Sequence, residues 1–215
     1  MLKKWVDNTK DQSYFLAGLD QSQLSKALFP IGNMQKSEVR ELAREIWLPN
    51  AERKESQGIC FVGKVDIKEF LQKKIPNSIG EVYDTSWKLL GTHKWVFYYT
   101  IGQRKGLDIG GMPEPIFVVN KDIKNNRLIV GYGADDELYS DEMYCDEIHF
   151  LWEEKSFPVK CQAKIRYRQA DQEVEVFEEQ GKYKIQFSEK QRAIASGQIV
   201  AFYDGDELWG SGVIV

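Results

Sequence analysis

One cysteine stands out among the residues of this sequence that could do chemistry. Cys60 lies between two glycines in residues 55–63, a stretch that follows a run of charged residues. Because glycine permits backbone turns that a side chain would forbid, the thiol could be presented on a sharp bend. Nearby cations that would favour the nucleophilic thiolate, if they surround the sulfur in space, are Arg53, Lys54 and Lys64. The plainer interpretation is a structural cysteine in a short strand, since free cysteine is among the most buried residue types.

Length and composition are those of an ordinary globular protein. The chain has 215 residues, 42% hydrophobic and 29% charged, which is enough to bury a core in one or two domains. No apolar run approaches the length of a membrane span, and the N-terminus has no apolar segment of the signal-peptide type. We therefore expect a cytoplasmic protein with no membrane partner.

The cysteines and the net charge bear on whether the protein has disulfides, binds a metal or binds nucleic acid. Cys60, Cys145 and Cys161 form an odd and sparse set, unlike a disulfide framework, so reduced thiols are expected. No pair has the close spacing of a zinc site, and no metal site is predicted. A net charge of −4 argues against a globally basic nucleic-acid binder. It leaves room for a local basic face, because patch geometry sets phosphate contact.

Residues 1–76 are predicted to be mainly helical. Asp20 or Ser22 can cap a helix that ends before Pro30. Residues 36–47 carry apolar side chains at the spacing of a one-faced helix. Residues 66–69 resemble a capping box that would open a further helix.

From residue 77 onward the pattern changes to short, aromatic and β-branched segments separated by turn residues. The fold class is therefore α+β: a short helical N-terminal segment (1–76), a small central β domain (77–135) and a C-terminal antiparallel β-barrel (136–215). The expected strands are 80–83, 87–91, 116–120, 127–132, 142–150, 159–168, 173–178, 182–187, 199–203 and 207–213.

The expected strand 159–168 is the most basic stretch of the barrel. Strict alternation would place Lys160, Gln162, Lys164, Arg166 and Arg168 on one face. Same-face side chains on a strand lie roughly 6.5–7 Å apart, similar to the spacing of phosphates along a nucleic-acid strand. The alternative is a solvated outer face, which acidic residues on the neighbouring strand 173–178 could neutralise.

Two other stretches could meet an anion or a base. Residues 100–111 are rich in glycine and contain Arg104 and Lys105, so backbone amides and two cations could hold a phosphate. The stretch matches no established phosphate-loop pattern, and a structural hairpin with solvated cations is the alternative. Residues 8–15 combine a cation, a carboxylate, an amide and aromatic rings, which could clamp a flipped base. A helix cap with a hydrophobic staple is the plainer interpretation of that segment.

Six short motifs together resemble the tRNA-specific 2-thiouridylase family, the MnmA type, in the family's order. They are residues 10–16, 28–32, 56–63, 99–107, 165–169 and 196–198. The resemblance implies an enzyme that uses ATP to adenylate the C2 oxygen of the wobble uridine in certain tRNAs. A persulfide sulfur then replaces the activated oxygen. The family's SGGVDSS-type PP-loop and its first catalytic cysteine do not occur in this sequence. Residues 1–76 therefore resemble the tail of the ATP-binding domain, and the ATP site is expected outside this chain.

The resemblance also assigns residues by position. Cys60 matches the catalytic cysteine that carries the persulfide and can form a disulfide with a partner cysteine absent from this sequence. The residues that match tRNA-contacting positions are Lys10, Asp11, Gln12, Arg166, Tyr167 and Gln198. Possible further contacts with RNA or phosphate are Arg104, Lys105, Lys164 and Arg168.

The implied partners are tRNA and a sulfur donor, either a sulfur-relay protein or a cysteine desulfurase. On this interpretation the chain alone binds tRNA but does not complete catalysis, because it lacks the ATP-binding motif. The competing hypothesis is a non-catalytic RNA-binding β-barrel module in which Cys60 is structural.

Overall fold

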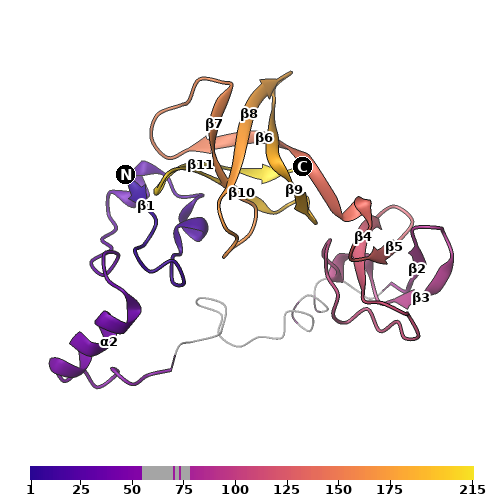
Figure 1. The fold of residues 1–215 in the computed structure, drawn as a ribbon, viewed down its shortest axis with the longest axis horizontal. Coiled ribbons are helices and arrows are strands. Elements are labelled where there is room, and N and C mark those ends of the chain that lie inside the picture. Colours follow the sequence, from indigo (N-terminus) through magenta and orange to yellow (C-terminus); the bar gives the residue numbers. More distant parts are fainter. Residues whose placement is uncertain (55–69, 71–72, 74–77) are drawn as a thin grey trace. The chain divides into compact units, whose positions relative to one another are not determined.

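The computed structural model describes residues 1–54, 70, 73 and 78–215 (Figure 1). Cys60 lies outside the described residues, as does the helix expected after the capping box at 66–69, apart from positions 70 and 73. The chain forms two compact units. One combines Met1–Arg53 with Asp141–Gln191 and Ala195–Val215, and the other combines Lys54–Ser140 with Arg192–Ile194. No described helix is long and apolar enough to cross a membrane.

The first unit is built on a closed barrel of six strands. They follow the order β11-β10-β7-β8-β9-β6, and β11 pairs with β6 to close the ring. Their bounds are β6 (Tyr139–Phe150), β7 (Val159–Lys164), β8 (Gln172–Glu179), β9 (Lys182–Arg192), β10 (Ile199–Asp204) and β11 (Glu207–Ile214). Alternate residues of each strand point inward, so that Cys161 and Ala163 of β7 and Val174 and Val176 of β8 are buried. Closure leaves the barrel without an exposed sheet edge.

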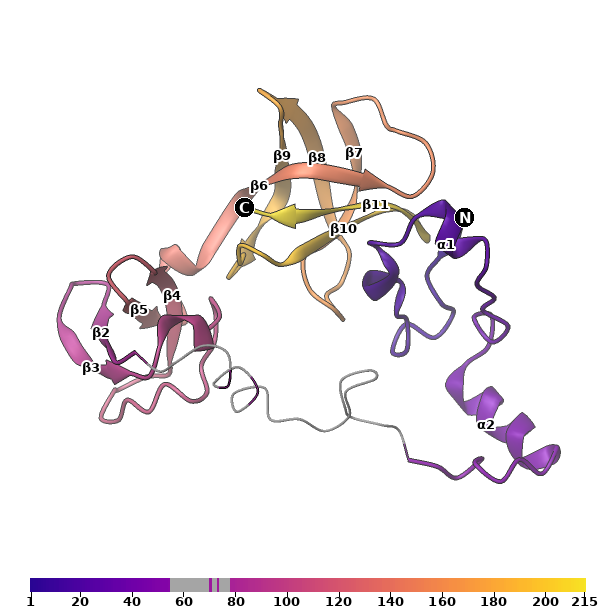
Figure 2. The same cartoon turned by 180° about the vertical axis from the view of Figure 1, so that it is seen from behind.

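The N-terminal segment packs on this barrel and extends its sheet. Strand β1 (Leu2–Lys3) pairs with β11, placing Leu2 opposite Leu208. Figures 1 and 2 both show the segment beside β11. Leu2, Ala17 and Leu208 share a buried cluster with Tyr203 of β10. Residues near the start of the chain are therefore part of the barrel unit.

Short helices follow in the N-terminal segment: η1 (Ser13–Leu16), α1 (Gln21–Leu24) and α2 (Lys36–Glu45). Asp20 caps α1 as predicted, in a reciprocal capping box with Gln23. The predicted continuation of α1 toward Pro30 is wrong, because the helix ends after four residues and buries none of them. Helix α2 ends two residues before the predicted end at position 47, since Trp47 has a left-handed φ of 56°.

The second unit is a four-stranded sheet in the order β3-β2-β5-β4. Its strands are β2 (Gly80–Asp84), β3 (Leu89–His93), β4 (Ile116–Asp122) and β5 (Arg127–Tyr132), with short turns η2 (Val96–Tyr98) and η3 (Asp136–Leu138). Strand β2 runs parallel to β5, whereas the other two pairings are antiparallel. The core contains Val82, Leu128 and Val130 from the strands, with Val96 and Leu107 from the connection. The sequence-based assignment of an α+β fold with a central β region and a C-terminal barrel is confirmed.

The ten strands expected between residues 80 and 213 are all present, but one ends early. Strand β7 stops at Lys164, not at 168, because the backbone amide of Ile165 donates to the side-chain oxygen of Gln169 (2.9 Å). Arg168 also has a left-handed φ of 66°. The predicted stripe of five polar side chains on one strand face is therefore wrong, since Arg166 and Arg168 lie in the turn that follows.

Acidic partners cover part of what remains of that stripe. Lys160 lies opposite Glu175 in the pairing of β7 with β8. Gln162 lies opposite Glu173 and donates to its carboxylate (3.0 Å). Acidic residues of β8 thus lie beside the outer face of β7, where the alternative interpretation expected them, and one of them is hydrogen-bonded to Gln162.

Candidate nucleic-acid interface

Asp11 organises the segment that carries three of the predicted RNA contacts. Its Oδ1 accepts hydrogen bonds from the backbone amides of Trp5 (3.2 Å) and Ser13 (3.0 Å), and its Oδ2 accepts from the Ser13 hydroxyl (2.9 Å). The Ser13 hydroxyl also lies 3.1 Å from that of Tyr203 in β10. Asp11 is only 8% exposed, so its carboxylate holds the loop in shape. Its assignment as an RNA contact stays a prediction, as do those of its neighbours, the half-buried Lys10 and the exposed Gln12.

Aromatic side chains connect this segment to the turn after β7. The ring centroids of Phe15 and Tyr167 lie 4.5 Å apart, and Phe15 is 61% exposed. The hydroxyl of neighbouring Tyr14 donates to the carbonyl of Ile199 (2.8 Å). Burial raises the pKa of Tyr14, and the charge of Arg166 opposes that rise, so the guanidinium lies close enough to act on the phenol. Residues from both ends of the chain thus meet here.

A glutamine network holds the turn of residues 165–171. The side chain of Gln169 accepts from Ile165 and donates to Gln191 (2.8 Å), which donates to Gln172 (2.8 Å). Such fully bonded networks restrict side-chain and backbone conformations. The guanidinium of Arg168 lies 5.2 Å from the ring centre of Tyr167, within the range of a cation–π contact.

Gln198 lies one residue before the contact between Tyr14 and Ile199. Its backbone amide donates to Ala195 (3.2 Å), its carbonyl accepts from Ile214 (2.9 Å), and its side chain is exposed. The structure therefore brings most of the predicted RNA contacts to one surface of the barrel unit. We call it the barrel-end surface and define it as Lys10, Gln12, Phe15, Arg166, Tyr167 and Gln198.

A cavity of about 760 Å³ lies in the same unit. Its lining includes the cations Lys4, Lys10, Lys164 and Arg168 and the carboxylates Asp11, Asp171 and Asp206. Sequence reasoning missed Lys4, because nothing near it in the sequence indicates that it lies beside strand β7. It did not list Phe15 among the tRNA-contacting residues, although this side chain is exposed next to a second aromatic ring.

Arg104 and Lys105 lie in the other unit, in the loop before β4. Both are exposed. The side chain of Gln103 accepts from the amide of Thr100 (3.0 Å) and donates to the carbonyl of Lys105 (2.9 Å), which closes the loop on itself. A side chain at Gly102 would come within 2.6 Å of the Cβ of Ala193, so the glycine there permits a close backbone approach. These contacts favour a structural role for the glycines.

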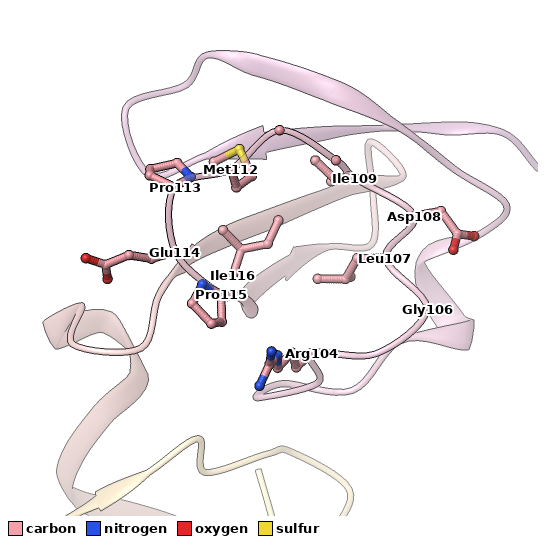
Figure 3. Close-up of a pocket in the computed structure, with 12 residues that line it drawn as sticks. Arg104, Gly106, Leu107, Asp108, Ile109, Met112, Pro113, Glu114, Pro115 and Ile116 are labelled. Carbon is pink, nitrogen blue, oxygen red and sulfur yellow. The ribbon is translucent and has the colours of Figure 1, made fainter.

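A pocket of about 610 Å³ adjoins this loop. Figure 3 shows Leu107 and Ile116 near its middle, and the carboxylates of Asp108 and Glu114 at its sides. Arg104 is the cation among its lining residues. With two carboxylates and an apolar centre, the pocket is poorly suited to a phosphate.

The two described cysteines have no features of a reactive site. Cys145 and Cys161 are free thiols buried in the barrel unit, and burial raises the pKa of each to about 12. Both are therefore protonated at neutral pH and poor nucleophiles. Among the described residues, no group of three histidine, cysteine or acidic side chains is placed to hold a metal ion.

A small closed barrel with exposed aromatic rings and cations on one surface has the composition of a nucleic-acid-binding module. Comparison with known proteins narrows the class. Three family models match consecutive parts of the chain: a tRNA methyl transferase HUP domain (residues 1–64), a tRNA methyl transferase PRC-barrel domain (68–132) and an aminomethyltransferase beta-barrel domain (140–214).

The relatives that match nearly the whole chain are named for thiolation. The tRNA-specific 2-thiouridylase MnmA of Shouchella clausii is 49% identical over 99% of this chain and 59% of its own length. That of Listeria monocytogenes is 48% identical over 99% and 58%, and that of Halalkalibacterium halodurans 46% over 97% and 57%. This chain belongs to the tRNA-specific 2-thiouridylase family, which confirms the resemblance found in the motifs. It spans less than two thirds of the length of these relatives.

Proposed function

We propose that this chain is the tRNA-binding and sulfur-carrying part of a tRNA 2-thiouridylase, which transfers sulfur to C2 of the wobble uridine. The observation that carries the proposal is the convergence of Lys10, Gln12, Arg166, Tyr167 and Gln198 on the barrel-end surface. The segments that supply them are far apart in sequence, and contacts of Tyr14 and Phe15 join them.

The composition of this surface suits single-stranded RNA. A base in the anticodon loop must be turned out of its stack before its C2 atom can react, and aromatic rings and guanidinium planes can hold such bases. The cations contribute affinity through the phosphate backbone, which makes binding salt-dependent. An exposed phenylalanine beside a tyrosine is unfavourable in water, so a stacking partner would offset part of that cost.

We propose Cys60 as the residue that carries the persulfide. Cys145 and Cys161 are buried with pKa values raised to about 12, which leaves Cys60 as the cysteine available for such chemistry in this chain. The terminal sulfur of that persulfide would replace the activated oxygen of the uridine, which leaves with AMP. A second cysteine of the complete enzyme would then form a disulfide with Cys60, which breaks the bond between Cys60 and the transferred sulfur. The sulfur donor would be a sulfur-relay protein or a cysteine desulfurase. The cytoplasm, where tRNA and reduced thiols occur together, is the compartment that this chemistry implies.

In the complete enzyme ATP would activate the uridine at a site that this chain does not contain. We assign residues 1–76 to the tail of the ATP-binding domain, 77–135 to a central domain and 136–215 to the barrel, as modules of that enzyme. By itself the chain is expected to bind tRNA without hydrolysing ATP. Release of pyrophosphate by the purified chain would contradict this assignment.

Binding of tRNA by this chain across a salt series tests the proposal. We expect affinity to fall as salt rises, with a slope that reports the number of phosphate contacts. The double variant Arg166→Ala/Tyr167→Ala should weaken binding at every salt concentration, because it removes one cation and one stacking ring. Equal binding by wild type and double variant would rule out the barrel-end surface as the tRNA site.

A further inference from the structure

Two lysines from distant parts of the sequence share one carboxylate at the edge of the barrel. The ammonium of Lys4 lies 2.9 Å from Oδ2 of Asp171 and donates to the carbonyl of Gly205 (2.8 Å). The ammonium of Lys164, at the end of β7, lies 3.6 Å from Oδ1 of the same carboxylate. One acidic side chain thus faces two cations.

The two lysines are withdrawn from water, whereas the carboxylate is not. The side chains of Lys4 and Lys164 are 8% and 14% exposed, and that of Asp171 is 40% exposed. Both ammoniums also lie over the ring of Tyr203, 4.4 Å and 5.3 Å from its centre. The lysines are therefore held in place by the barrel, while Asp171 can turn toward solvent without losing a buried position.

The surroundings add positive charge. The cavity of about 760 Å³ that contains this site is also lined by Lys10 and Arg168. Of its other two carboxylates, that of Asp11 is already engaged by three donors, and Asp206 is exposed. Partly desolvated ammoniums that share a single carboxylate bind a further anion, or a replacement anion, more strongly than ammoniums in water do.

We propose that Lys4 and Lys164 form a phosphate-binding site in which the carboxylate of Asp171 occupies the anion position until a phosphate replaces it. The proposal rests on the proposed tRNA-binding function, and the ligand expected there is a phosphodiester of the RNA backbone. A phosphodiester carries the same single charge as the carboxylate and offers two free oxygens, one for each ammonium. Asp171 lies at the end of the turn that carries Arg166 and Tyr167, so the exchange takes place next to the barrel-end surface.

The decisive variant is Asp171→Asn, because the two roles considered for this residue predict opposite changes in tRNA affinity. If Asp171 competes with phosphate, its neutralisation tightens tRNA binding by about threefold to tenfold. If Asp171 only ties the N-terminal segment to the barrel, the same variant weakens binding. Glu179→Gln is the matched control, since Glu179 is exposed at the far end of β8 and the variant makes the same change in charge.

Lysine variants test the other half of the site. Lys4→Ala should weaken tRNA binding and lower the salt slope by about one. Lys4→Arg should restore the slope, because it keeps the charge. Lys3→Ala is the control for loss of a cation, since Lys3 is the exposed residue of β1 that directly precedes Lys4. Thermal unfolding of each variant shows whether the barrel remains folded.

Inorganic phosphate separates this site from the tRNA function as a whole. Phosphate should raise the melting temperature of Asp171→Asn more than that of the wild type, because binding to the folded state stabilises it. If wild type binds no tRNA but phosphate stabilises Asp171→Asn through Lys4, the tRNA proposal fails and the site serves free phosphate. The phosphate site is overturned, while the tRNA function stands, if wild type binds tRNA but Asp171→Asn changes neither the tRNA affinity nor the stabilisation by phosphate. Weaker tRNA binding by Asp171→Asn would have the same meaning.

Discussion

Two clusters in the molecule contain the same kinds of side chain, two aromatic rings and an arginine. In the barrel unit Phe15 and Tyr167 lie 4.5 Å apart, and Arg168 lies over Tyr167. In the central unit Tyr83 and Trp87 lie 5.8 Å apart, and Arg127 lies over Tyr83. We call Tyr83, Trp87 and Arg127 the central-unit cluster.

The clusters differ in how their charge is compensated. Beside the central-unit cluster, the carboxylate of Glu81 accepts a hydrogen bond from the hydroxyl of Tyr83 (2.7 Å) and lies 3.9 Å from Arg127. In the barrel unit, no ion pair joins Arg168 to a carboxylate among the described residues. Composition alone therefore does not distinguish a nucleic-acid surface from a structural hairpin. We expect the distinction to lie in whether the cation is already paired with a neighbouring side chain.

The largest expected contrast concerns the thiols. Cys145 and Cys161 have pKa values raised to about 12 by burial, so almost no thiolate is present near pH 7.5. Cys60, as the proposed sulfur carrier, should react with iodoacetamide about a thousandfold faster than either. Mass spectrometry of peptides after timed alkylation measures the three rates, and alkylation in denaturant provides the control in which they converge. If Cys60 reacts no faster in the native chain, the hypothesis of a structural cysteine in a binding module is favoured.

A pair of double variants compares the cations of the two units. Arg166→Ala/Tyr167→Ala should weaken tRNA binding by about tenfold or more, since it removes a phosphate contact and a stacking ring. Arg104→Ala/Lys105→Ala removes two exposed cations from a loop that closes on itself, and should weaken binding less than about threefold. Filter binding at one moderate salt concentration measures both. An equal loss from the two variants would mean that the glycine-rich loop is also part of the tRNA site.

Single aromatic variants give a smaller and sharper comparison. Phe15 and Trp87 are each 61% exposed, so they are matched in exposure. Phe15→Ala should reduce tRNA affinity by about fivefold, the lower end of the effect of a lost base–aromatic stack. Trp87→Ala should leave the tRNA affinity unchanged, because Arg127, the cation of the central-unit cluster, already lies beside the carboxylate of Glu81. A loss from Trp87→Ala would show that an exposed ring suffices without an uncompensated cation.

Local sequence patterns predicted the strands because alternation of buried and exposed residues is a local property. Strand β8, for example, alternates buried Val174 and Val176 with exposed or half-buried acids. The cap of α1 by Asp20 was predictable for the same reason, since its partner Gln23 is three residues away. The end of β7 at Lys164 was not, because the side chain of Gln169 captures the next backbone amide and alternation carries no sign of that contact.

The candidate site was proposed from the sequence as a set of residues, but not as a surface. Family motifs selected Lys10, Arg166 and Tyr167, but no local pattern places the N-terminal segment on the barrel. That placement depends on contacts between opposite ends of the chain, such as Leu2 with Leu208 and Ser13 with Tyr203. Lys4 and its shared carboxylate depend on the same contacts, which is why they emerge only from the structure.

The smallest expected effect is a difference in acid sensitivity between the two units. His93 is 4% exposed in the central unit, and its Nε2 lies 3.1 Å from the carbonyl of Asn126. Burial lowers its pKa below the ordinary 6.5, despite hydrogen bonds with the backbone that act in the opposite direction. The unfolded chain therefore binds a proton that the folded unit excludes, and the stability contributed by neutral His93 is lost as pH falls below about 6.5.

Hydrogen exchange resolved by mass spectrometry can follow the two units separately at about pH 7.5 and pH 5.5, after correction for intrinsic exchange rates. Peptides from residues 78–135 should lose protection on acidification, while those from 141–191 serve as the internal reference. His93→Gln should remove the pH dependence from the central unit even if it lowers protection at both pH values. Equal loss of protection in the two units, or a pH dependence that survives in His93→Gln, would mean that another group controls the acid response. In that case the contrast between the units would rest on their surface charges alone.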